Sequence, residues 1–451
     1  MTVGNDLKLI IAFALPLFAG NVFQQLYNMV DTWTVGNYVS NEAFSAVGTV
    51  APIINTFISV FTGFSTGSSV VISHYYGAKN YEKVHDAVHT AITLAGLIAV
   101  FLTVVGILMV PTMLRLTKTP AEVFPESRAY LTIYFAGVAG LLFYNMSAGI
   151  LRAVGDSRRP FYYLVTSALI NTALDLLFVI RFHLGVRGVA FATIIAQAIS
   201  AMLALGTLLR TDICVKLRPQ DLKIHTDMLG KIVRTGLPAA VQMGITSFSN
   251  VFVQSYINQF GRFCMGGWTA YHKVDQLIML PMQSIGMAVS TFVGQNLGCG
   301  QTERARKGVR TAVMMSIVVT VSLSALVIFF APQLVRFFID TPETVTYGTL
   351  FLRRLTPFYG ICCINQVLTQ ALRGAGNSKT PMVFILFSYV LFRQIYLFIT
   401  SNFISNTLLP LAMAYPAGWI VCSILMFWYY RTHDLNRTSL VSASERRTGS
   451  R

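Results

Sequence analysis

The chain has 451 residues, of which 54% are apolar and only 12% are charged. This charged share is about half of that found in soluble globular proteins, which excludes that class. The excess of 34 Lys and Arg over 18 Asp and Glu is typical of basic cytoplasmic loops in a polytopic membrane protein, so we do not expect nucleic acid as a partner.

Apolar runs of about 20 residues, the length that crosses a bilayer, recur along the whole chain. The first run follows Lys8 without a small-residue cleavage site, so we interpret it as a retained span and not a signal peptide. The runs predict an all-α polytopic membrane protein whose partner is the lipid bilayer, with twelve transmembrane helices at roughly 8–33, 44–72, 88–110, 127–150, 160–181, 188–209, 231–258, 266–292, 309–332, 346–371, 381–402 and 407–430.

The basic residues between these spans indicate on which side of the membrane the loops and the two termini lie. If the spans alternate in direction, most Lys and Arg residues outside them fall on the side of the two chain ends. Cytoplasmic loops carry such an excess in polytopic proteins. We therefore predict that both termini are cytoplasmic.

An internal repeat divides the chain into two six-helix lobes. The sequence LRAVGDSRRP begins at residue 151 and LRGAGNSKTP begins at residue 372, which is 221 residues later. At the same offset YYGAKNYEKV (from 75) matches NLGCGQTERA (from 296), and at an offset of 222 LPLFAGNVFQQ (from 15) resembles LPAAVQMGITS (from 237). Both copies of each loop are basic, so the lobes share one orientation, as in transporters that move two lobes around a central cavity.

The repeat sets the expected domains. We expect an N-lobe at 1–210, a polar and basic cytoplasmic linker at 211–230, a C-lobe at 231–431 and a basic tail at 432–451.

The repeated loop LRxxGxSxxP has a structural interpretation. Its Gly can end a helix at low backbone cost, its Ser can cap the next helix, and its Pro suits an early helical position. We expect Arg152 and Arg373 at helix C-termini, where a positive charge is favourable.

The first half has two carboxylates deep in its spans, Asp31 and Asp175. Asp31 lies 15 residues after Pro16, and Asp175 lies 15 residues after Pro160, which is about 22 Å along a helix in both cases. We therefore expect both acids at a similar depth in the outer half of the membrane.

Polar residues accompany the two acids. Tyr27 precedes Asp31 by one helical turn, Asn171 precedes Asp175 by one turn, and such pairs share a helix face. The next span returns from outside and brings Thr193 to a comparable depth. We predict that Tyr27, Asp31, Asn171, Asp175 and Thr193 form one polar layer.

The presence of acidic residues within transmembrane segments requires an explanation, because burying them in the bilayer is unfavourable. A charged group in the bilayer centre costs at least roughly 2.5–3.5 kcal/mol, and such acids often mark ion or proton pathways. The alternative is that hydrogen bonds hold each Asp for packing alone. At the repeat offset, however, Asn171 and Asp175 correspond to Phe392 and Tyr396, so the second lobe lacks the layer. Both a proton and a small hard cation suit the oxygen-rich set.

The second half has a different group of charges within its spans. Lys273 and Asp275 are two residues apart and do not share a helix face, so each needs a partner elsewhere. One hypothesis is mutual salt bridging within the lobe, and the other is binding of an anionic part of a substrate. The residues concerned are Lys273, Asp275, Arg353, Arg354 and Arg393.

Other motifs do not support catalysis or a metal site. The six cysteines show neither a disulfide nor a zinc spacing. GFSTG at 63–67 fits GxSxG but lies within an apolar helix, not at a strand-to-helix turn. His85 and His89 are one turn apart, which an amphipathic loop helix explains as well as a metal would. We expect no enzyme, no metal and no cofactor besides a coupling ion.

Several of these segments together resemble one family. The two-times-six arrangement, YNMVDTWTVG at 27–36, GQNLGCGQTERA at 294–305 and the paired LRAVGDSRRP and LRGAGNSKTP loops resemble the multidrug and toxic compound extrusion (MATE) family. The resemblance covers almost the whole chain. It implies a pair of six-helix lobes that exports organic compounds, often cationic and amphipathic, in exchange for H⁺ or Na⁺.

Residue by residue, the chain resembles the DinF-like branch of that family. The resemblance implies a cation site at Tyr27 and Asp31 of helix 1, Asn171 and Asp175 of helix 5 and Thr193 of helix 6, and a bend of helix 1 at Pro16. A glutamate that another branch carries in helix 7 is missing near Thr246, so no second cation site is implied there.

The expected function is therefore secondary active antiport by alternating access in a bacterial cytoplasmic membrane. We expect a monomer that exports small molecules or drugs. The alternative within transport is a flippase for lipid-linked oligosaccharides, for which Arg353, Arg354 and Arg393 would be the phosphate-binding candidates. A channel, which would conduct without coupling, is the alternative from another class.

Overall fold

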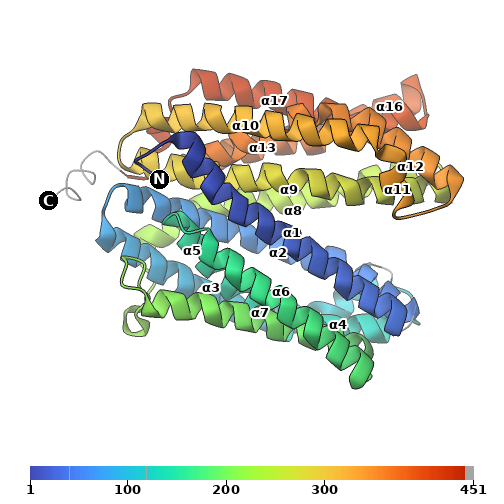
Figure 1. Cartoon of the computed structure of the whole chain (residues 1–451), viewed down its shortest axis with the longest axis horizontal. Coiled ribbons are helices and arrows are strands. Elements are labelled where there is room, and N and C mark those ends of the chain that lie inside the picture. Colours follow the sequence, from blue (N-terminus) through green and yellow to red (C-terminus); the bar gives the residue numbers. More distant parts are fainter. Residues whose placement is uncertain (40, 118, 442–451) are drawn as a thin grey trace. The chain divides into compact units, whose positions relative to one another are not determined.

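The computed structural model describes residues 1–39, 41–117 and 119–441, and in these ranges all regular structure is helical (Figure 1). The first half of the chain contains seven α-helices, and a π-helical turn η1 (Leu177–Arg181) extends α6. The helices are α1 (Asp6–Tyr38), α2 (Asn41–Gly77), α3 (Tyr81–Leu116), α4 (Phe124–Ala136), α5 (Val138–Ala153), α6 (Arg158–Leu176) and α7 (Gly185–Arg210).

The second half repeats this plan with more interruptions. The helices are α8 (Thr226–Asn258), α9 (Arg262–Gly298), α10 (Thr302–Phe329), α11 (Ala331–Arg336), α12 (Pro342–Leu355), α13 (Tyr359–Gly374), α14 (Lys379–Leu386), α15 (Arg393–Ile399), α16 (Leu408–Ala412) and α17 (Ala414–Thr432). The π-helical segments η4 (Phe387–Phe392) and η5 (Thr400–Ile404) flank α15.

Many of these helices can cross a membrane. Within the described residues, nine are long and apolar enough, or ten if the bent pair α4 and α5 forms one span. Of the twelve expected spans, the two outside this count correspond to α8 and to the pair α12 and α13. The latter are only 14 and 16 residues long, separated by the 3₁₀ turn η3 (Thr356–Phe358), where Pro357 interrupts the helical hydrogen bonding.

The sequence predicts one straight helix at 127–150, and this prediction is wrong because the segment forms two helices. It is bent by 47° between α4 and α5, at Gly137. A side chain at Gly137 would place its Cβ 2.4 Å from Ile194 of α7, so glycine permits α7 to pack closely at the bend.

The repeat is visible in the backbone of the loops. Gly155 and Gly376, which are equivalent in the two copies, have φ values of 97° and 91°, a conformation that favours glycine. The predicted serine caps are wrong, because Ser157 and Ser378 have helical backbone angles and make no side-chain cap. The preceding Asp156 instead accepts the N–H groups of Arg158 and Arg159, and Asn377 accepts that of Thr380, all at 3.1 Å.

Arg152 and Arg373 lie in the last turns of α5 and α13, as predicted. Their positive charges therefore lie near the negative ends of the helix dipoles, and the Arg373 guanidinium donates to the side-chain oxygen of Gln242.

The chain forms two compact units that exchange parts of the first helix of each repeat. Within the described residues, the N-unit runs from Ala19 to Ala240, and the C-unit joins residues 1–18 to residues 241–441. Within the N-unit, α5 packs against α2, α3 and α7, and within the C-unit, α9 packs against α10, α12 and α13. The unit boundaries therefore cut α1 and α8, whereas the domain boundaries expected from sequence lie in the linker.

A close helix crossing holds the first part of α8 on α2 within the N-unit. A Cβ added at Gly63 would lie 2.5 Å from the backbone nitrogen of Ala240, and one at Gly67 would lie 2.6 Å from the Cα of Gly236. Glycines at the crossing thus allow the two backbones to approach.

We predict that Gly63→Ala lowers the stability of the protein by about 1–3 kcal/mol, because the added methyl group pushes α8 away from α2. Gly48 is the matched control in the same helix, since nothing lies within 4 Å of a Cβ there. Gly48→Ala should leave the thermal unfolding temperature in detergent unchanged or raise it. Equal unfolding temperatures for the two variants would contradict the close crossing.

Candidate functional site

The two predicted acids lie beside each other in the N-unit. Asp31 is on α1, and Asp175 is the penultimate residue of α6, two positions before the π-helical turn η1. Asp175 is fully buried, and Asp31 is partly buried with its Oδ1 shielded from solvent. Their carboxyl groups are close enough to hydrogen-bond if one of them carries a proton.

Tyr27 and Asn171 each lie one helical turn before one of these acids, and Thr193 lies on α7. Tyr27, one turn before Asp31, lies close to both carboxyl groups. Asn171 is one turn before Asp175 on the same helix and is 2% exposed. Thr193 of α7 is buried and donates its hydroxyl hydrogen to the carbonyl of Val189 at 2.9 Å, so its oxygen can still accept.

Five buried polar atoms of this group have no hydrogen-bond partner in the described part of the chain. They are Oδ1 of Asp31, both carboxylate oxygens of Asp175, and Oδ1 and Nδ2 of Asn171. A buried polar atom without a partner costs about 1–3 kcal/mol, and more when it is charged. A proton between the carboxyl groups, or a small cation among the oxygens, would supply partners to this layer.

The structure adds three residues that the sequence analysis missed. Tyr130 of α4 lies near both acids and near Thr193, and Tyr134 lies near Gln197 of α7. Both tyrosines are buried, and their rings stack with centroids 6.4 Å apart. A signal existed, because Tyr130 lies three residues into the span expected at 127–150, at a depth comparable with that of Thr193.

Pro16 lies inside α1, which continues as a helix on both sides of it. The boundary between the C-unit and the N-unit follows Phe18, which is two residues after Pro16. The predicted hinge is therefore remote along the helix from Asp31, near the beginning of α1.

The predicted charges of the C-lobe do not form mutual salt bridges. In the described ranges no acid lies within ion-pair distance of Lys273, Arg353, Arg354 or Arg393. Lys273 and the two arginines at the end of α12 are exposed. These three side chains extend away from the protein core, so the bridging hypothesis is wrong for the described residues.

Arg393 is buried among neutral partners. It donates to Ser249 Oγ and to Asn250 Oδ1, both at 2.8 Å, and its guanidinium lies 4.9 Å from the ring centre of Tyr415. Hydrogen bonds and the ring face thus replace a carboxylate as partners of this cation.

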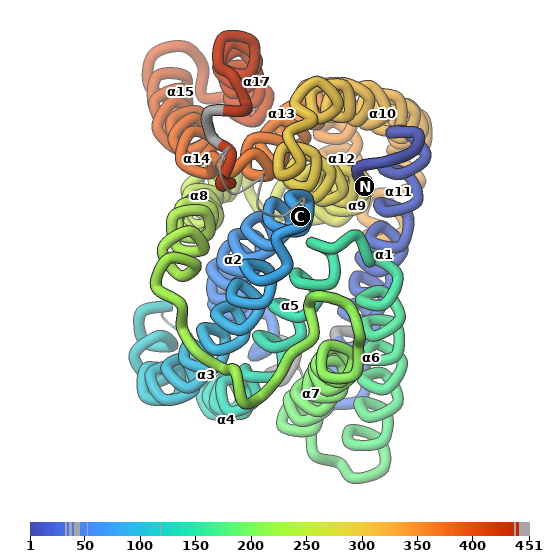
Figure 2. The backbone as a smooth tube through the Cα atoms, turned by 90° about the vertical axis from the view of Figure 1, so that its left-hand side faces the viewer, coloured from blue at the N-terminus to red at the C-terminus, as the bar shows by residue number. Residues whose placement is uncertain are grey.

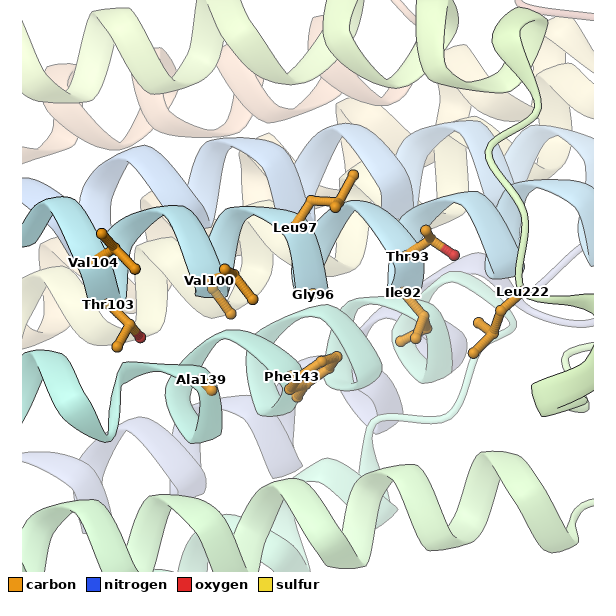
Figure 3. A pocket seen from close by; sticks show the side chains of 11 residues that line it. Ile92, Thr93, Gly96, Leu97, Val100, Thr103, Val104, Ala139, Phe143 and Leu222 are labelled. Atoms are coloured by element: carbon orange, nitrogen blue, oxygen red, sulfur yellow. The ribbon is translucent and has the colours of Figure 1, made fainter.

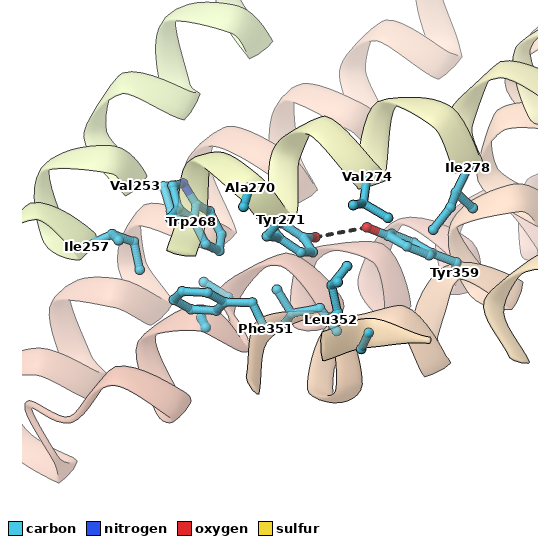
Figure 4. Close-up of a cluster of buried hydrophobic side chains, with 14 of the residues drawn as sticks. Val253, Ile257, Trp268, Ala270, Tyr271, Val274, Ile278, Phe351, Leu352 and Tyr359 are labelled. Carbon is cyan, nitrogen blue, oxygen red and sulfur yellow. Dashed lines mark hydrogen bonds between the residues drawn. The ribbon is translucent and has the colours of Figure 1, made fainter. Parts of the chain in front are cut away.

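Asp275 belongs to an aromatic cluster of the C-unit. Its Oδ1 accepts a 2.5 Å hydrogen bond from the Tyr359 hydroxyl, which in turn lies 3.0 Å from the Tyr271 hydroxyl (Figure 4). Trp268 stacks on Tyr271 with ring centroids 4.9 Å apart. His272 Nδ1 is 3.8 Å from Asp275 Oδ2, so the neighbours of this acid are Tyr359 and His272 and not Lys273.

The histidines of α3 hold the linker and offer a poor metal site. His85, His89 and Asp221 have possible ligand atoms within 4.8 Å of one another. His89, however, places Nδ1 2.8 Å from the carbonyl of His85 and accepts the Arg218 N–H at Nε2 at 3.0 Å. Both ring nitrogens are therefore used, and His85 faces Asp221 at 3.3 Å. The trace after α7 passes α3 before α8 begins (Figure 2).

An apolar groove of about 580 Å³ lies between α3 and α5 (Figure 3). Thr103, one of its few polar side chains, donates to the carbonyl of Phe135 at 3.2 Å, and Val100 is 66% exposed. The groove carries no charged group, which fits lipid chains and not an ion. Its lining consists of Ile92, Thr93, Gly96, Leu97, Ala99, Val100, Thr103, Val104, Ala139, Phe143 and Leu222.

Comparisons with known proteins identify the family. The MatE family model matches residues 16–177 and again residues 238–399, at an offset of 222. Two Bacillus subtilis relatives named probable multidrug resistance proteins are similar over most of the chain. YpnP is 27% identical over 95% of this chain and 96% of its own length, and YoeA is 29% identical over 93% and 92%.

A solved structure shows the same fold. It is titled the outward-facing conformation of a multidrug resistance MATE family transporter, with a TM-score of 0.90, 22% identity and coverage of 95% of this chain and 96% of that one. The all-helical arrangement of two repeated lobes predicted from sequence is therefore confirmed.

The fold and the double match define a multi-pass membrane transporter, not an enzyme. The chain belongs to the MatE family, as the resemblance indicated. The narrower assignment to the DinF-like branch stays a prediction.

We predict that Tyr359→Phe destabilises the C-unit by about 1–3 kcal/mol, because it removes the hydroxyl that donates to a half-buried carboxylate. Tyr347→Phe, on the partly buried face of α12, is the control. Thermal unfolding of the purified variants measures both changes. A similar unfolding temperature for Tyr359→Phe and the parent protein would contradict a hydrogen bond at Asp275.

Proposed function

We propose that this protein is a secondary active antiporter that exports organic compounds, cationic and amphipathic, in exchange for H⁺ or Na⁺ by alternating access. The observation that carries the proposal is the adjacent pair of carboxyl groups of Asp31 and Asp175, the second of which is fully buried. The names of the similar proteins, which refer to multidrug resistance, agree with an exporter.

Electrostatics make this pair responsive to cations. Two negative charges about 4 Å apart repel by about 4 kcal/mol at an effective dielectric constant of 20. One proton shared between the carboxyl groups removes this repulsion, and a second proton or a Na⁺ ion neutralises the pair. A membrane potential of 100 mV supplies about 2.3 kcal/mol per charge, which is of the same order, so an ion gradient can change the occupancy.

Export follows if the occupied and unoccupied states prefer different substrates. The protein loads a proton or Na⁺ at Asp31 and Asp175 from outside, and the N-lobe loses negative charge. A cationic substrate then binds less tightly, α1 rearranges near Pro16, and the compound leaves. The return of the ion to the cytoplasm restores the negative charge for the next substrate.

The ion itself is left to experiment. Hard cations prefer oxygen ligands. The predicted layer offers oxygen atoms from Tyr27, Asp31, Asn171, Asp175 and Thr193. The same carboxyl groups accept protons. We further propose a monomer in a bacterial cytoplasmic membrane with both termini in the cytoplasm, on the charge distribution of the loops.

The flippase alternative rests on one observation, the buried Arg393. A phosphate could replace Ser249 and Asn250 as its partners. Arg353 and Arg354 are exposed on α12, however, and a pyrophosphate site needs several converging cations. Binding of purified protein to a lipid-linked pyrophosphate, but not to dye-like cations, would favour the flippase.

We predict that Asp31→Asn and Asp175→Asn each abolish the dependence of efflux on the driving ion in proteoliposomes. A gradient of one pH unit supports about a tenfold concentration ratio per proton, and this factor should be lost. Separately imposed H⁺ and Na⁺ gradients identify the ion.

The control is Asp156→Asn, which alters an acid of the loop before α6 and keeps an acceptor for the next helix. It should transport like the parent protein. If both pair variants keep the full gradient dependence, these acids are not the coupling site.

A further inference from the structure

Two ion pairs in the protein are related by the internal repeat. Lys83 Nζ lies 3.3 Å from Asp227 Oδ2, and an Arg304 guanidinium nitrogen lies 3.1 Å from Asp6 Oδ1. Adding 221 to Asp6 and Lys83 gives Asp227 and Arg304. Asp6 in the first repeat is therefore equivalent to Asp227 in the second, and Lys83 is equivalent to Arg304.

Each pair joins one repeat to the other. Asp6 and Asp227 stand at the beginning of α1 and α8, the first helix of each repeat. Lys83 and Arg304 stand at the beginning of α3 and α10, the third helix of the opposite repeat. Each first helix therefore starts on the body of the other repeat.

Apolar packing continues both exchanges. Ile10, Phe13 and Leu17 of α1 are buried in a cluster with Ala288 and Phe292 of α9 in the C-unit. The corresponding part of α8 crosses α2 of the N-unit at Gly63 and Gly67. Each ion pair thus lies at one end of a longer helix contact, of α1 with α9 or of α8 with α2.

The two first helices change unit at equivalent points. The unit boundaries follow Phe18 and Ala240, each two residues after a proline, Pro16 or Pro238, that lies inside its helix. A proline inside a helix removes one backbone hydrogen bond and permits bending. Each first helix is therefore fixed to different units on the two sides of a weak point.

We propose that Asp6 with Arg304 and Asp227 with Lys83 are positioning residues that form two exchanged clasps, and that release of these clasps permits the transporter to open toward the cytoplasm. The inference rests on alternating access in the proposed function and on the predicted cytoplasmic side of these loops. When the units move apart on that side, each first helix must bend at its proline or leave the unit that holds its beginning.

The two clasps differ in strength. Arg304 also donates to the carbonyls of Thr2 and Gly4, both at 2.7 Å, and the side chains of Arg304 and Asp6 are 22% and 12% exposed. Lys83 and Asp227 are 32% and 52% exposed. More exposed ion pairs contribute less, so the Lys83–Asp227 clasp is expected to open first.

Equivalent labels can report the opening directly. Glu82 and Glu303 are exposed, equivalent neighbours of Lys83 and Arg304. Spin labels on Glu82→Cys and Glu303→Cys, with Cys214 and Cys299 replaced by Ser, give the distribution of distances between the two loops by double electron–electron resonance. The measurement on detergent-solubilised protein needs neither substrate nor ion gradient.

We expect Lys83→Gln and Asp227→Asn to raise the ratio of long to short distances about two- to fivefold, the range for one exposed ion pair. Asp6→Asn and Arg304→Gln should raise it further. The double exchange Lys83→Asp with Asp227→Lys should restore the parent distribution, which loss of folding would not do. Gel filtration confirms that each variant remains folded.

The control is Asp212→Asn, which breaks the linker ion pair with Lys216 at 3.2 Å and should leave the distances unchanged. Unchanged distances in all four clasp variants, or failure of the double exchange to restore them, would overturn the inference. Because the distances are measured without transport, this outcome is distinct from failure of the antiport proposal, which the efflux assay reports.

Discussion

The adjacent carboxyl groups of Asp31 and Asp175, the second of which is fully buried, are the main electrostatic constraint on the N-unit. Such a pair is unfavourable as two anions, and it becomes stable only when a proton or cation joins it. Asp31 and Asp175 come from α1 and α6, and Tyr130 of α4 lies near both acids. Side chains from three helices therefore meet near these carboxyl groups, which is why we propose that a change in their charge moves α1.

The repeat gives both lobes one scaffold but different polar chemistry. In the C-unit, Asp275 accepts from Tyr359, and Arg393 is paired with hydroxyl and amide oxygens. Those groups have partners, whereas the carboxylate oxygens of Asp175 have none among the described residues. A satisfied network keeps a structure fixed, and an unsatisfied one responds to a ligand. This difference is consistent with the proposal that only the first repeat carries a coupling site.

The sequence predicts the fold well because length and hydropathy determine spans, and the offset between copies determines the repeat. It also placed Asp31 and Asp175 at one depth, since the rise per residue of a helix is fixed. It missed Tyr130 and Gln197 because depth does not say which helices are neighbours. The Ser157 cap failed for a local reason, as its backbone angles are helical. The partners of Arg393 are neutral side chains of α8, and no charge pattern along the chain indicates them.

The central claim is that Asp31 and Asp175 share a proton, and that binding of the coupling ion changes the protonation of this pair. Infrared difference spectroscopy of the purified protein, recorded while pH or Na⁺ is varied, tests it directly, because a protonated carboxyl group has its own C=O band. The account predicts a buried carboxylic acid band that changes with the coupling ion and disappears in Asp175→Asn. A spectrum without such a band, or one that is identical in Asp175→Asn, would contradict it.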